Sequence, residues 1–361
     1  MKRVVVVGGG YAGTALARAL DATFEVVLIE PREAFVHNVA TIRALVVPSL
    51  MDRILLPYDR LLARGRVVRD RATAVADGAV TLAGGDTLEA DLVVLATGST
   101  YAQPFKPVTD SMADLRAASA ATHAALVAAR SVAIVGAGAV GVELAGEIAS
   151  TLKGRAVTLI SATPTLFPDF APRLGQRLLA DLKALGVTVR LGVRAAGLAE
   201  GDRSLPGPLR LETGEDIAAD LVVPALGARP VTALLSGLPG AGFDRIGRVE
   251  VDRWMRPAGL KRLFALGDMA ANGDLMTIVA SSRQAPWLAK TLAAVAAGKA
   301  VEDLPPYAPY AVPPILVPLG PARGASVLPL GRKGTVVGPF LTAAIKGKSL
   351  FIPRYHKEFG L

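Results

Sequence analysis

The 361-residue sequence contains no cysteine, and this absence removes several classes of protein from consideration. Without thiols the chain cannot form disulfides, cysteine-rich zinc sites, iron–sulfur clusters or a dithiol redox relay. Histidine is also scarce, because only His37, His123 and His356 are present and they lie far apart in the sequence. We therefore expect no metal site.

Long apolar runs are missing as well, although hydrophobic residues make up 52% of the sequence. No segment offers the roughly 18 consecutive apolar residues that a membrane-spanning helix requires. The longest uncharged run, residues 304–322, contains seven prolines and cannot form one continuous helix. The first residues lead directly into an apolar strand, and Lys2 stands where an N-myristoylation signal requires glycine. These features predict a cytoplasmic protein.

Positive charge is in excess, with 40 Lys and Arg residues against 31 acids and a net charge of +9. Residues 331–361 hold six basic residues and one acid, so more than half of the excess lies in this tail. A basic chain suits an anionic partner, such as a phosphorylated cofactor, a membrane surface or nucleic acid. Because aromatic residues are only 5% and do not alternate with an arginine cluster, we expect no nucleic-acid binding.

One sequence unit occurs twice, 128 residues apart, and organises the chain. Each copy is an apolar strand, a G-x-G-x-x-G turn, an alanine-rich helix and a second apolar strand. The turn residues are Gly8, Gly9, Gly10, Tyr11, Ala12 and Gly13 in the first copy and Gly136, Gly138 and Gly141 in the second.

The three glycines of such a turn each have a physical role. The first permits the tight turn, the second lets the backbone approach a pyrophosphate, and the third lets the helix pack closely on the strand. The helix N-terminus then presents free N–H groups and the positive end of its dipole to the phosphates. Two copies in the same context predict two dinucleotide-binding sites.

The residue that ends the second strand of each copy distinguishes the two sites. Glu30 stands 17 residues past Gly13, where a carboxylate can accept both ribose hydroxyls of an adenosine; the alternative is a solvated acid at a strand end. Ser161 occupies the matching place in the second copy. A neutral side chain there does not repel a 2′-phosphate, so we expect NADPH to be accepted as well as NADH, unless Ser161 is an ordinary loop residue.

Two further markers follow the glycine turns. The apolar run of residues 91–98 ends in Gly98 and has an echo at residues 220–227, which predicts buried strands returning to a ligand crevice. In residues 262–268 a buried strand delivers the carboxylate of Asp268 into the interior. Taken alone, such an aspartate is more often a helix cap or turn residue.

The order of these markers resembles the flavoproteins with two dinucleotide-binding domains, which bind FAD on the first turn and NAD(P)H on the second. The match is most similar to the AMID-like, ferroptosis-suppressor branch, which is related to apoptosis-inducing factor and to type II NADH:quinone dehydrogenases. Residues 35–46, 96–100, 141–147 and 345–351 carry this likeness. Members that reduce disulfides, and sulfide:quinone reductase, need cysteines and are excluded.

The resemblance implies an α/β fold with two Rossmann-like domains and a C-terminal α+β cap. The FAD-binding domain would comprise residues 1–103 and 252–298, the NAD(P)H-binding domain residues 104–251, and the cap residues 299–361. The tail combines apolar residues with Lys346 and Lys348, which favours contact with an anionic membrane surface. Packing of the same face on the FAD domain, or on a second subunit in a homodimer, is the alternative.

The resemblance also implies the activity, an FAD-dependent NAD(P)H:quinone oxidoreductase. Glu143 would face the nicotinamide nucleotide, and Lys346 would stand near the flavin–quinone site and supply protons to the quinol. His37 has either a flavin-side role or that of a hydrogen-bonded core histidine. The FAD contacts that the resemblance implies are residues 8–12, Arg43, Val75 through its backbone, and Asp268 at the ribityl chain.

Two other functions stay open from the sequence. The flavoenzyme can instead reduce a soluble iron–sulfur protein, whose acidic surface would dock on a basic one. Alternatively the chain is a redox-sensing or nucleic-acid-binding protein, as basic relatives of apoptosis-inducing factor suggest.

Overall fold

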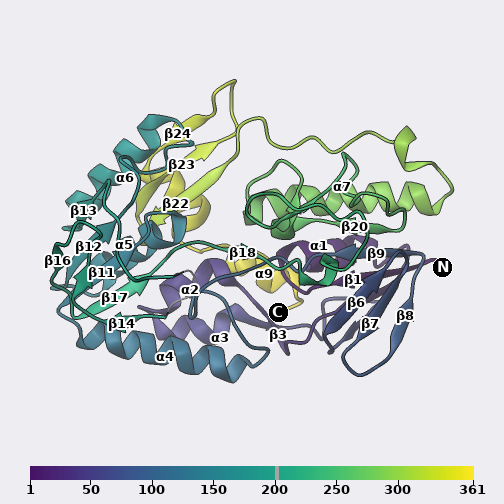
Figure 1. The fold of residues 1–361 in the computed structure, drawn as a ribbon, viewed down its shortest axis with the longest axis horizontal. Coiled ribbons are helices and arrows are strands. Elements are labelled where there is room, and N and C mark those ends of the chain that lie inside the picture. Colours follow the sequence, from purple (N-terminus) through teal and green to yellow (C-terminus); the bar gives the residue numbers. More distant parts are fainter. Residues whose placement is uncertain (200–202) are drawn as a thin grey trace.

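A computed structural model describes residues 1–199 and 203–361, and two five-stranded sheets form its two halves (Figure 1). The first sheet is parallel throughout, in the order β20-β9-β1-β2-β5. Its strands are β1 (Arg3–Val7), β2 (Glu25–Ile29), β5 (Arg66–Val68), β9 (Leu92–Leu95) and β20 (Leu263–Ala265). The four valines of β1 are all buried, as expected for a parallel strand covered on both faces.

Helices and a small antiparallel sheet complete this half. Helix α1 (Tyr11–Leu20) joins β1 to β2 and packs against α7 (Ile278–Ala296), as Figure 1 shows. The remaining elements are β3 (Ala34–Val36), α2 (Asn38–Ala44), η1 (Pro48–Leu50), α3 (Met51–Ile54), β4 (Leu55–Pro57), β6 (Ala72–Ala76), β7 (Ala79–Leu82), β8 (Thr87–Glu89), β19 (Val249–Glu250), η3 (Gly267–Met269) and β21 (Ala270–Ala271).

The second half repeats the plan, with a sheet in the order β13-β12-β11-β17-β14. Only β14, at one edge, runs antiparallel to its neighbour. The sheet contains β11 (Ser131–Val135), β12 (Ala156–Ile160), β13 (Thr188–Arg190), β14 (Leu205–Pro206) and β17 (Leu221–Pro224), with α4 (Met112–Ala128), α5 (Ala139–Thr151), α6 (Pro172–Ala184) and the hairpin β15 (Leu209–Arg210) and β16 (Asp216–Ile217). The predicted α/β class with two Rossmann-like units is confirmed.

The chain passes between the halves at a short antiparallel ribbon of β10 (Ser99–Thr100) and β18 (Arg229–Pro230). Leu235, the last residue of η2 (Ala233–Leu235), and Val249 both pack in the core of the first sheet. The chain therefore returns to the first half before the boundary that we predicted at residue 251. The domain bounds themselves stay predictions.

The C-terminal segment joins both halves. Its antiparallel sheet, β22 (Ile315–Leu319), β23 (Arg323–Leu328) and β24 (Thr335–Val337), follows η4 (Val301–Asp303) and packs on α5 and α6. The chain then forms α8 (Pro339–Thr342), the π-helical turn η5 (Ala343–Gly347) and α9 (Ile352–Glu358). Tyr355 of α9 and Phe359, which follows this helix, are buried in the core of the first half, beside α1. Over residues 1–199 and 203–361, no helix has the length and apolar character needed to cross a membrane.

Candidate functional site

The first glycine turn has the geometry that phosphate binding requires. Gly8 has φ +109°, and a Cβ added to it would lie 2.5 Å from the carbonyl oxygen of Ala96. A Cβ on Gly13 would lie 1.9 Å from the carbonyl oxygen of Gly8, so neither glycine can be replaced without moving backbone. At Gly10 the added Cβ would have no described atom within 4 Å. This open space is where the backbone can meet a ligand.

The second turn reproduces each of these features. Gly136 has φ +108° and its added Cβ would lie 2.3 Å from the carbonyl oxygen of Ala225, while that of Gly141 would lie 1.9 Å from the carbonyl oxygen of Gly136. Gly138, like Gly10, faces open space among the described residues. The two copies therefore share their backbone conformation as well as their sequence.

The helices that follow the two turns begin without side-chain caps. Within the described chain, α1 and α5 start after Gly10 and Gly138 with no side chain bonded to their first N–H groups, and neither has an acid in its first turn. By contrast, Ser111 caps α4 and Thr277 caps α7. Uncapped N–H groups at the end of a helix dipole are the donors that a pyrophosphate uses.

A cleft of about 580 Å³ opens at the first turn. It runs along the carboxyl ends of the first sheet, from Glu30 and the start of β6 to Asp268 and Ser281. Gly8, Gly10, Tyr11, Ala12 and Gly98, all predicted to contact cofactor, line it. Asn38 also lines the cleft, and its buried Oδ1 has no hydrogen-bond partner in the described residues.

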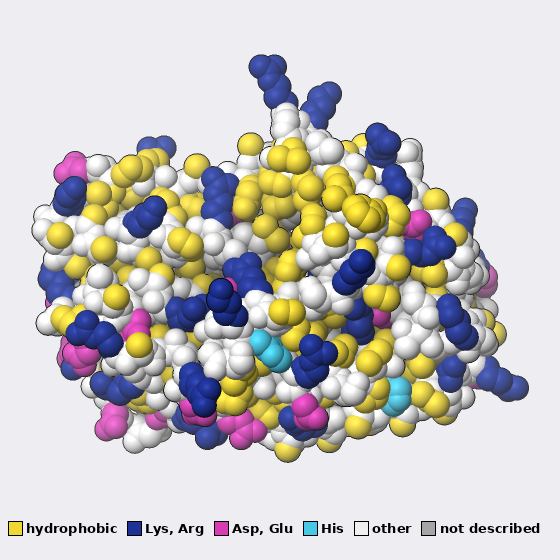
Figure 2. All heavy atoms as spheres, turned by 180° about the vertical axis from the view of Figure 1, so that it is seen from behind, with side chains coloured by type: hydrophobic (Ala, Val, Ile, Leu, Met, Phe, Trp, Pro, Cys, Tyr) yellow, Lys and Arg dark blue, Asp and Glu magenta, His cyan; other side chains and the backbone are white. Residues whose placement is uncertain are grey.

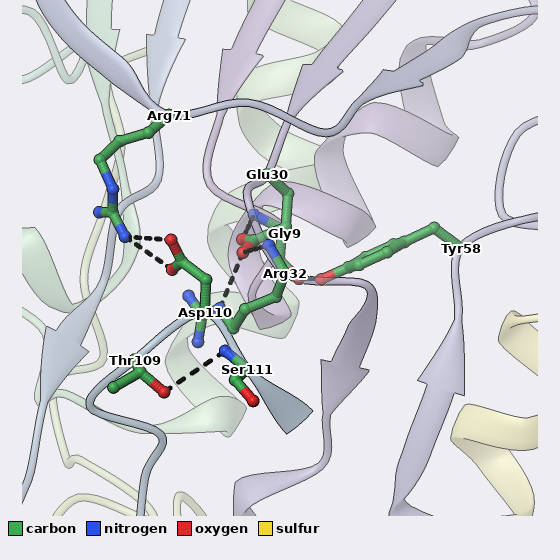
Figure 3. Close-up of polar contacts among 8 residues, drawn as sticks. All are labelled: Gly9, Glu30, Arg32, Tyr58, Arg71, Thr109, Asp110 and Ser111. Atoms are coloured by element: carbon green, nitrogen blue, oxygen red, sulfur yellow. Dashed lines mark hydrogen bonds and ion pairs between the residues drawn. The ribbon is translucent and has the colours of Figure 1, made fainter. Parts of the chain in front are cut away.

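Glu30 is fixed at one end of this cleft, as Figure 3 shows. Its side chain is 1% exposed, with Oε2 accepting from the N–H of Gly9 at 2.7 Å and Oε1 from Nε of Arg32 at 2.7 Å. The hydroxyl of Tyr58 donates to the carbonyl of Gly9 at 2.8 Å. Oε1 also accepts from the backbone N–H of Arg32 at 3.1 Å, so Oε2 is the oxygen that keeps a lone pair with which Glu30 can accept a ribose hydroxyl.

An ion pair between two cleft-lining segments lies near Glu30. Nη2 of Arg71, just before β6, contacts both carboxylate oxygens of Asp110 at 2.6 Å (Figure 3). Residues 106–110 thereby form part of the cleft wall. Since both side chains are largely exposed, the pair contributes little stability, and its importance is in shaping the cleft.

Asp268 stands at the other end of the cleft within a polar group. Ser99 donates to its Oδ2 at 2.6 Å, and Nζ of Lys106 donates to Ser99 Oγ at 2.6 Å and lies 3.6 Å from the same Oδ2. Burial lowers the pKa of Lys106, although the carboxylate opposes this shift. The N–H of Gly267 donates to Oε1 of Gln284 at 2.8 Å, which fixes the turn before Asp268. The sequence motifs gave no signal for Lys106 or Gln284.

His37 connects the first turn to the tail. The hydroxyl of Tyr11 accepts from the N–H of Val39 at 3.0 Å, so it donates to Nδ1 of His37, also at 3.0 Å. Nε2 of His37 then carries the proton and donates to the carbonyl of Leu350 at 2.6 Å. Burial lowers the pKa of His37 to about 4, so the ring is neutral at pH 7. In this position it is a hydrogen-bonded core histidine, and it does not line the cleft.

Glu143, predicted to face the nicotinamide, and Lys346, predicted near the quinone site, lie side by side. Nζ of Lys346 donates to Oε1 of Glu143 at 2.7 Å and to the carbonyl of Leu316 at 3.1 Å. Glu143 is 5% exposed and Lys346 9% exposed. Burial raises the pKa of Glu143, while the ammonium group of Lys346 works against the rise.

Arg43 lies in the same interface. Its Nε donates to Oε1 of Glu147 at 2.8 Å and its Nη1 donates to the carbonyl of Gly347 at 2.7 Å. Neither Arg43 nor Val75, which belongs to the core on β6, lines the cleft. Their predicted FAD contacts stay predictions.

The strand end of the second copy has a different character from that of the first. Ser161 is 5% exposed and its Oγ lies 2.8 Å from Oγ1 of Thr163, in a neutral polar site. A separate hollow of about 570 Å³ lies beside Arg130 and Asp220, at the amino ends of β11 and β17 and so on the opposite edge from Gly136. Within the described ranges, no three His, Asp or Glu side chains are grouped to hold a metal.

These features fit FAD on the first turn. The open space at Gly10 and the uncapped start of α1 suit the phosphates of such a ligand. The carboxylates of Glu30 and Asp268, one at each end of the cleft, suit its hydroxyls, and the unpaired amide oxygen of Asn38 suits a ring N–H group.

Comparison with known proteins gives a consistent result. The family described as pyridine nucleotide-disulphide oxidoreductase matches residues 2–285. Apoptosis-inducing factor homolog B of Dictyostelium discoideum is 28% identical over 98% of this chain and 96% of its own length. Ferroptosis suppressor protein 1 of Mus musculus is 27% identical over 78% of this chain and 82% of its own length.

Two solved structures share the fold. The ferredoxin reductase for the CYP199A2 system of Rhodopseudomonas palustris aligns with a TM-score of 0.66 and 20% identity, covering 87% of this chain and 79% of that one. The water-forming NADH oxidase from Lactobacillus brevis, bound to NADH, aligns with a TM-score of 0.64 and 21% identity, covering 81% and 69%.

Proposed function

Because this chain belongs to the pyridine nucleotide-disulphide oxidoreductase family, we propose that it transfers electrons from NAD(P)H through FAD to a quinone. The predicted branch, the oxidoreductase class and the FAD and NAD(P)H cofactors are confirmed. The quinone is the proposal. The observation that carries it is the buried Glu143–Lys346 pair, a proton donor held where the tail meets α5 in a chain that has no thiol.

When bound, FAD would supply the redox chemistry, which is uptake of a hydride from NAD(P)H and delivery of two electrons to an acceptor. The chain's own groups would bind and orient the cofactors. N–H groups at the start of α1 would hold the pyrophosphate, Glu30 the adenosine ribose, and Asp268 the ribityl chain. The N-terminus of α5 would hold the nicotinamide nucleotide, and Ser161 would leave room for a 2′-phosphate, so that both NADH and NADPH are accepted.

NAD(P)H, one proton and a quinone give NAD(P)⁺ and a quinol, so the chain must supply one proton besides the hydride. Nζ of Lys346 gives this proton to a quinone oxygen, and Glu143, whose pKa burial raises, takes up a proton and returns it to Nζ across the 2.7 Å hydrogen bond. A positioned general acid of this kind contributes roughly 100- to 10,000-fold to a rate.

The test separates the two half-reactions. Anaerobic protein is mixed first with NADH and then with a quinone, and the visible flavin absorbance is followed. In Lys346→Met, NADH should bleach the flavin at the native rate. Quinone should reoxidise the flavin at least about 100-fold more slowly than in the native protein, because the proton donor is gone. The control is Lys348→Met, which removes an exposed neighbouring charge. Reoxidation of Lys346→Met at the native rate would contradict the role of Lys346 as proton donor. If the native protein reduces every artificial acceptor but no quinone, the proposal that a quinone is the acceptor is wrong.

Reduction of a soluble iron–sulfur carrier is the second candidate. The net charge of +9 and the fold shared with a ferredoxin reductase favour it. An acidic ferredoxin that accepts electrons faster than any quinone, with turnover falling steeply as salt is added, would replace the quinone by this acceptor. A redox-sensing, nucleic-acid-binding role would require that the protein retard the migration of DNA in a gel at physiological salt.

We also propose that the protein is cytoplasmic and that its cap makes a peripheral contact with the inner face of the membrane. Leu330, Phe340 and Leu341 are 57%, 82% and 44% exposed. Arg332 and Lys333 are exposed at the turn between β23 and β24. In Figure 2 apolar side chains gather on the upper part of the molecule, below two protruding basic side chains. Apolar groups edged by cations suit an anionic lipid surface.

Two other apolar residues of the tail are buried against protein, which is the alternative to membrane contact that the sequence left open. Leu350 and Ile352 are 2% and 4% exposed, so this segment packs on protein. Sedimentation with vesicles of phosphatidylglycerol or phosphatidylcholine tests the remaining face. Phe340→Ser/Leu341→Ser should lose binding to the anionic vesicles, whereas Val127→Ser, on α4, should not. Equal binding by all variants, or a dimer that the double variant dissociates, would contradict the membrane role.

A further inference from the structure

We propose that Arg43 and Glu147 form a positioning pair that holds Glu143 and Lys346 in register for proton transfer. This inference rests on the proposed function of Lys346. It assigns Arg43 a place in the interface of three segments, whereas the sequence resemblance implies a contact with FAD.

The geometry ties Arg43 to both members of the proton-transfer pair. Its Nε and Nη2 lie 2.8 and 2.7 Å from Oε1 of Glu147, which stands one helical turn after Glu143 on α5. Its Nη1 donates at 2.7 Å to the carbonyl of Gly347, the residue that follows Lys346 in η5. One guanidinium from α2 therefore fixes both the helix that carries Glu143 and the turn that carries Lys346.

The four side chains form a neutral, buried group of two acids and two bases. None of these side chains is more than 11% exposed, and the two ion pairs lie on successive turns of α5. The titratable groups facing them are Arg43 from α2, Glu143 and Glu147 from α5, and Lys346 from η5, with His37 preceding α2. Burial raises the pKa of Glu147, and Arg43 opposes that rise.

Stability alone does not account for this arrangement. Buried ion pairs are often no more stabilising than well-packed apolar residues of the same size. Glu147 Oε2 is moreover buried with no hydrogen-bond partner among the described residues. A planar guanidinium whose Nε binds Glu147 and whose Nη1 reaches a carbonyl fixes distance and direction, which is what a proton donor requires and what lysine cannot reproduce.

The variants are Arg43→Met, Arg43→Lys and the double variant Arg43→Met/Glu147→Met. The matched control is Arg210→Met, which breaks the exposed pair of Arg210 with Asp216. Four quantities are measured: FAD bound per chain, bleaching by NADH, the pH profile of reoxidation by quinone, and labelling of Lys346 by an amine-specific reagent, quantified by peptide mass spectrometry.

In Arg43→Met we expect the FAD content and the rate of bleaching by NADH to stay within about twofold of the native values. Reoxidation by quinone should be slowed roughly 10- to 100-fold, which is the effect of displacing the proton donor by about 1 Å. The acidic limb of the pH profile should move slightly to higher pH, because Arg43 adds to the lowering of the pKa of Glu143 by Lys346 and this addition is lost. Labelling of Lys346 should rise. Arg43→Lys should be intermediate, and it carries the test if Arg43→Met does not fold. The double variant should recover part of the rate, since no unpaired buried acid is left.

Loss of FAD in proportion to loss of activity in Arg43→Lys would overturn the inference and make Arg43 a cofactor ligand. Native reoxidation, pH profile and labelling in Arg43→Met would overturn it as well. If the native protein reduces no quinone, the proposed function fails instead, whereas the labelling of Lys346 still reports whether Arg43 and Glu147 position it.

Discussion

The two glycine-turn units are nearly identical in backbone and differ in what surrounds the ligand. The first glycine of each has φ close to +108°, the second faces open space, and the third packs against the carbonyl of the first. The strand that follows ends in a buried, bonded Glu30 in one unit and in neutral Ser161 in the other. The backbone of the turn is thus common to the two units, and the residue at the strand end differs between them.

The units also differ in their connection to the rest of the chain. The first helix begins with Tyr11, which bonds His37 and through it the tail, whereas Ala139 occupies this place in the second. The second unit is joined to the tail further along its helix, where Nζ of Lys346 donates to Glu143 of α5. The tail therefore contacts the first helix through its first residue and the second helix through its second turn.

The largest effect should come from filling the open space in either turn. A Cβ added at Gly10 or at Gly138 meets no described atom within 4 Å beyond the adjacent residues, so Gly10→Val and Gly138→Val should both fold. Gly10→Val should weaken FAD binding by about 1000-fold, or 4 kcal/mol, and purify colourless. Gly138→Val should stay yellow but lose saturation by NADH. Absorbance, circular dichroism and nucleotide titration check this, and a colourless Gly138→Val would contradict the division of roles.

Acid should destabilise the first unit through His37. Its pKa is about 4 in the fold and near 6.5 in an unfolded chain, so the unfolded state binds more protons between these values. Stability should therefore fall as the pH is lowered from 6.5 to 4, by up to about 3 kcal/mol for this group. Urea unfolding should show a smaller fall in His37→Gln than in His123→Gln, and equal falls in both would disprove the effect.

Glu30→Ala should cost less but affect both ligand and fold. It leaves the N–H of Gly9 and the guanidinium of Arg32 without their acceptor, a loss of about 2 kcal/mol. FAD affinity should fall as well, because the ribose loses its carboxylate. Ser161→Ala, the equivalent change in the second unit, should leave thermal stability and FAD content close to native. Similar losses in both variants would contradict the asymmetry of the strand ends.

The smallest expected effect concerns nucleotide choice. Ser161→Glu introduces the carboxylate that the first unit has, and it should lower kcat/KM for NADPH about tenfold relative to NADH, or 1.4 kcal/mol. Steady-state kinetics with both nucleotides measures the ratio. An unchanged ratio would place the 2′-phosphate away from Ser161.

The sequence predicted the parts of the site that local motifs determine. The residues of the first turn, Glu30, Gly98 and Asp268 belong to strand–turn segments whose spacing fixes where they lie. All of these except Gly9 and Gly13 line the cleft. The parts that depend on contacts distant in sequence could not be predicted. His37 bonds a carbonyl 313 residues away and Arg43 one 304 residues away. Lys106 follows no motif, and only folding brings it to Ser99 and Asp268.

A crystal structure of the protein with FAD and NADH tests the central claim most directly. The account predicts FAD along Gly8–Gly13 with its ribose on Glu30, and NADH on the turn at Gly136–Gly141 with its adenosine beside Ser161. FAD on the second turn, or a first turn that binds no dinucleotide, would contradict it.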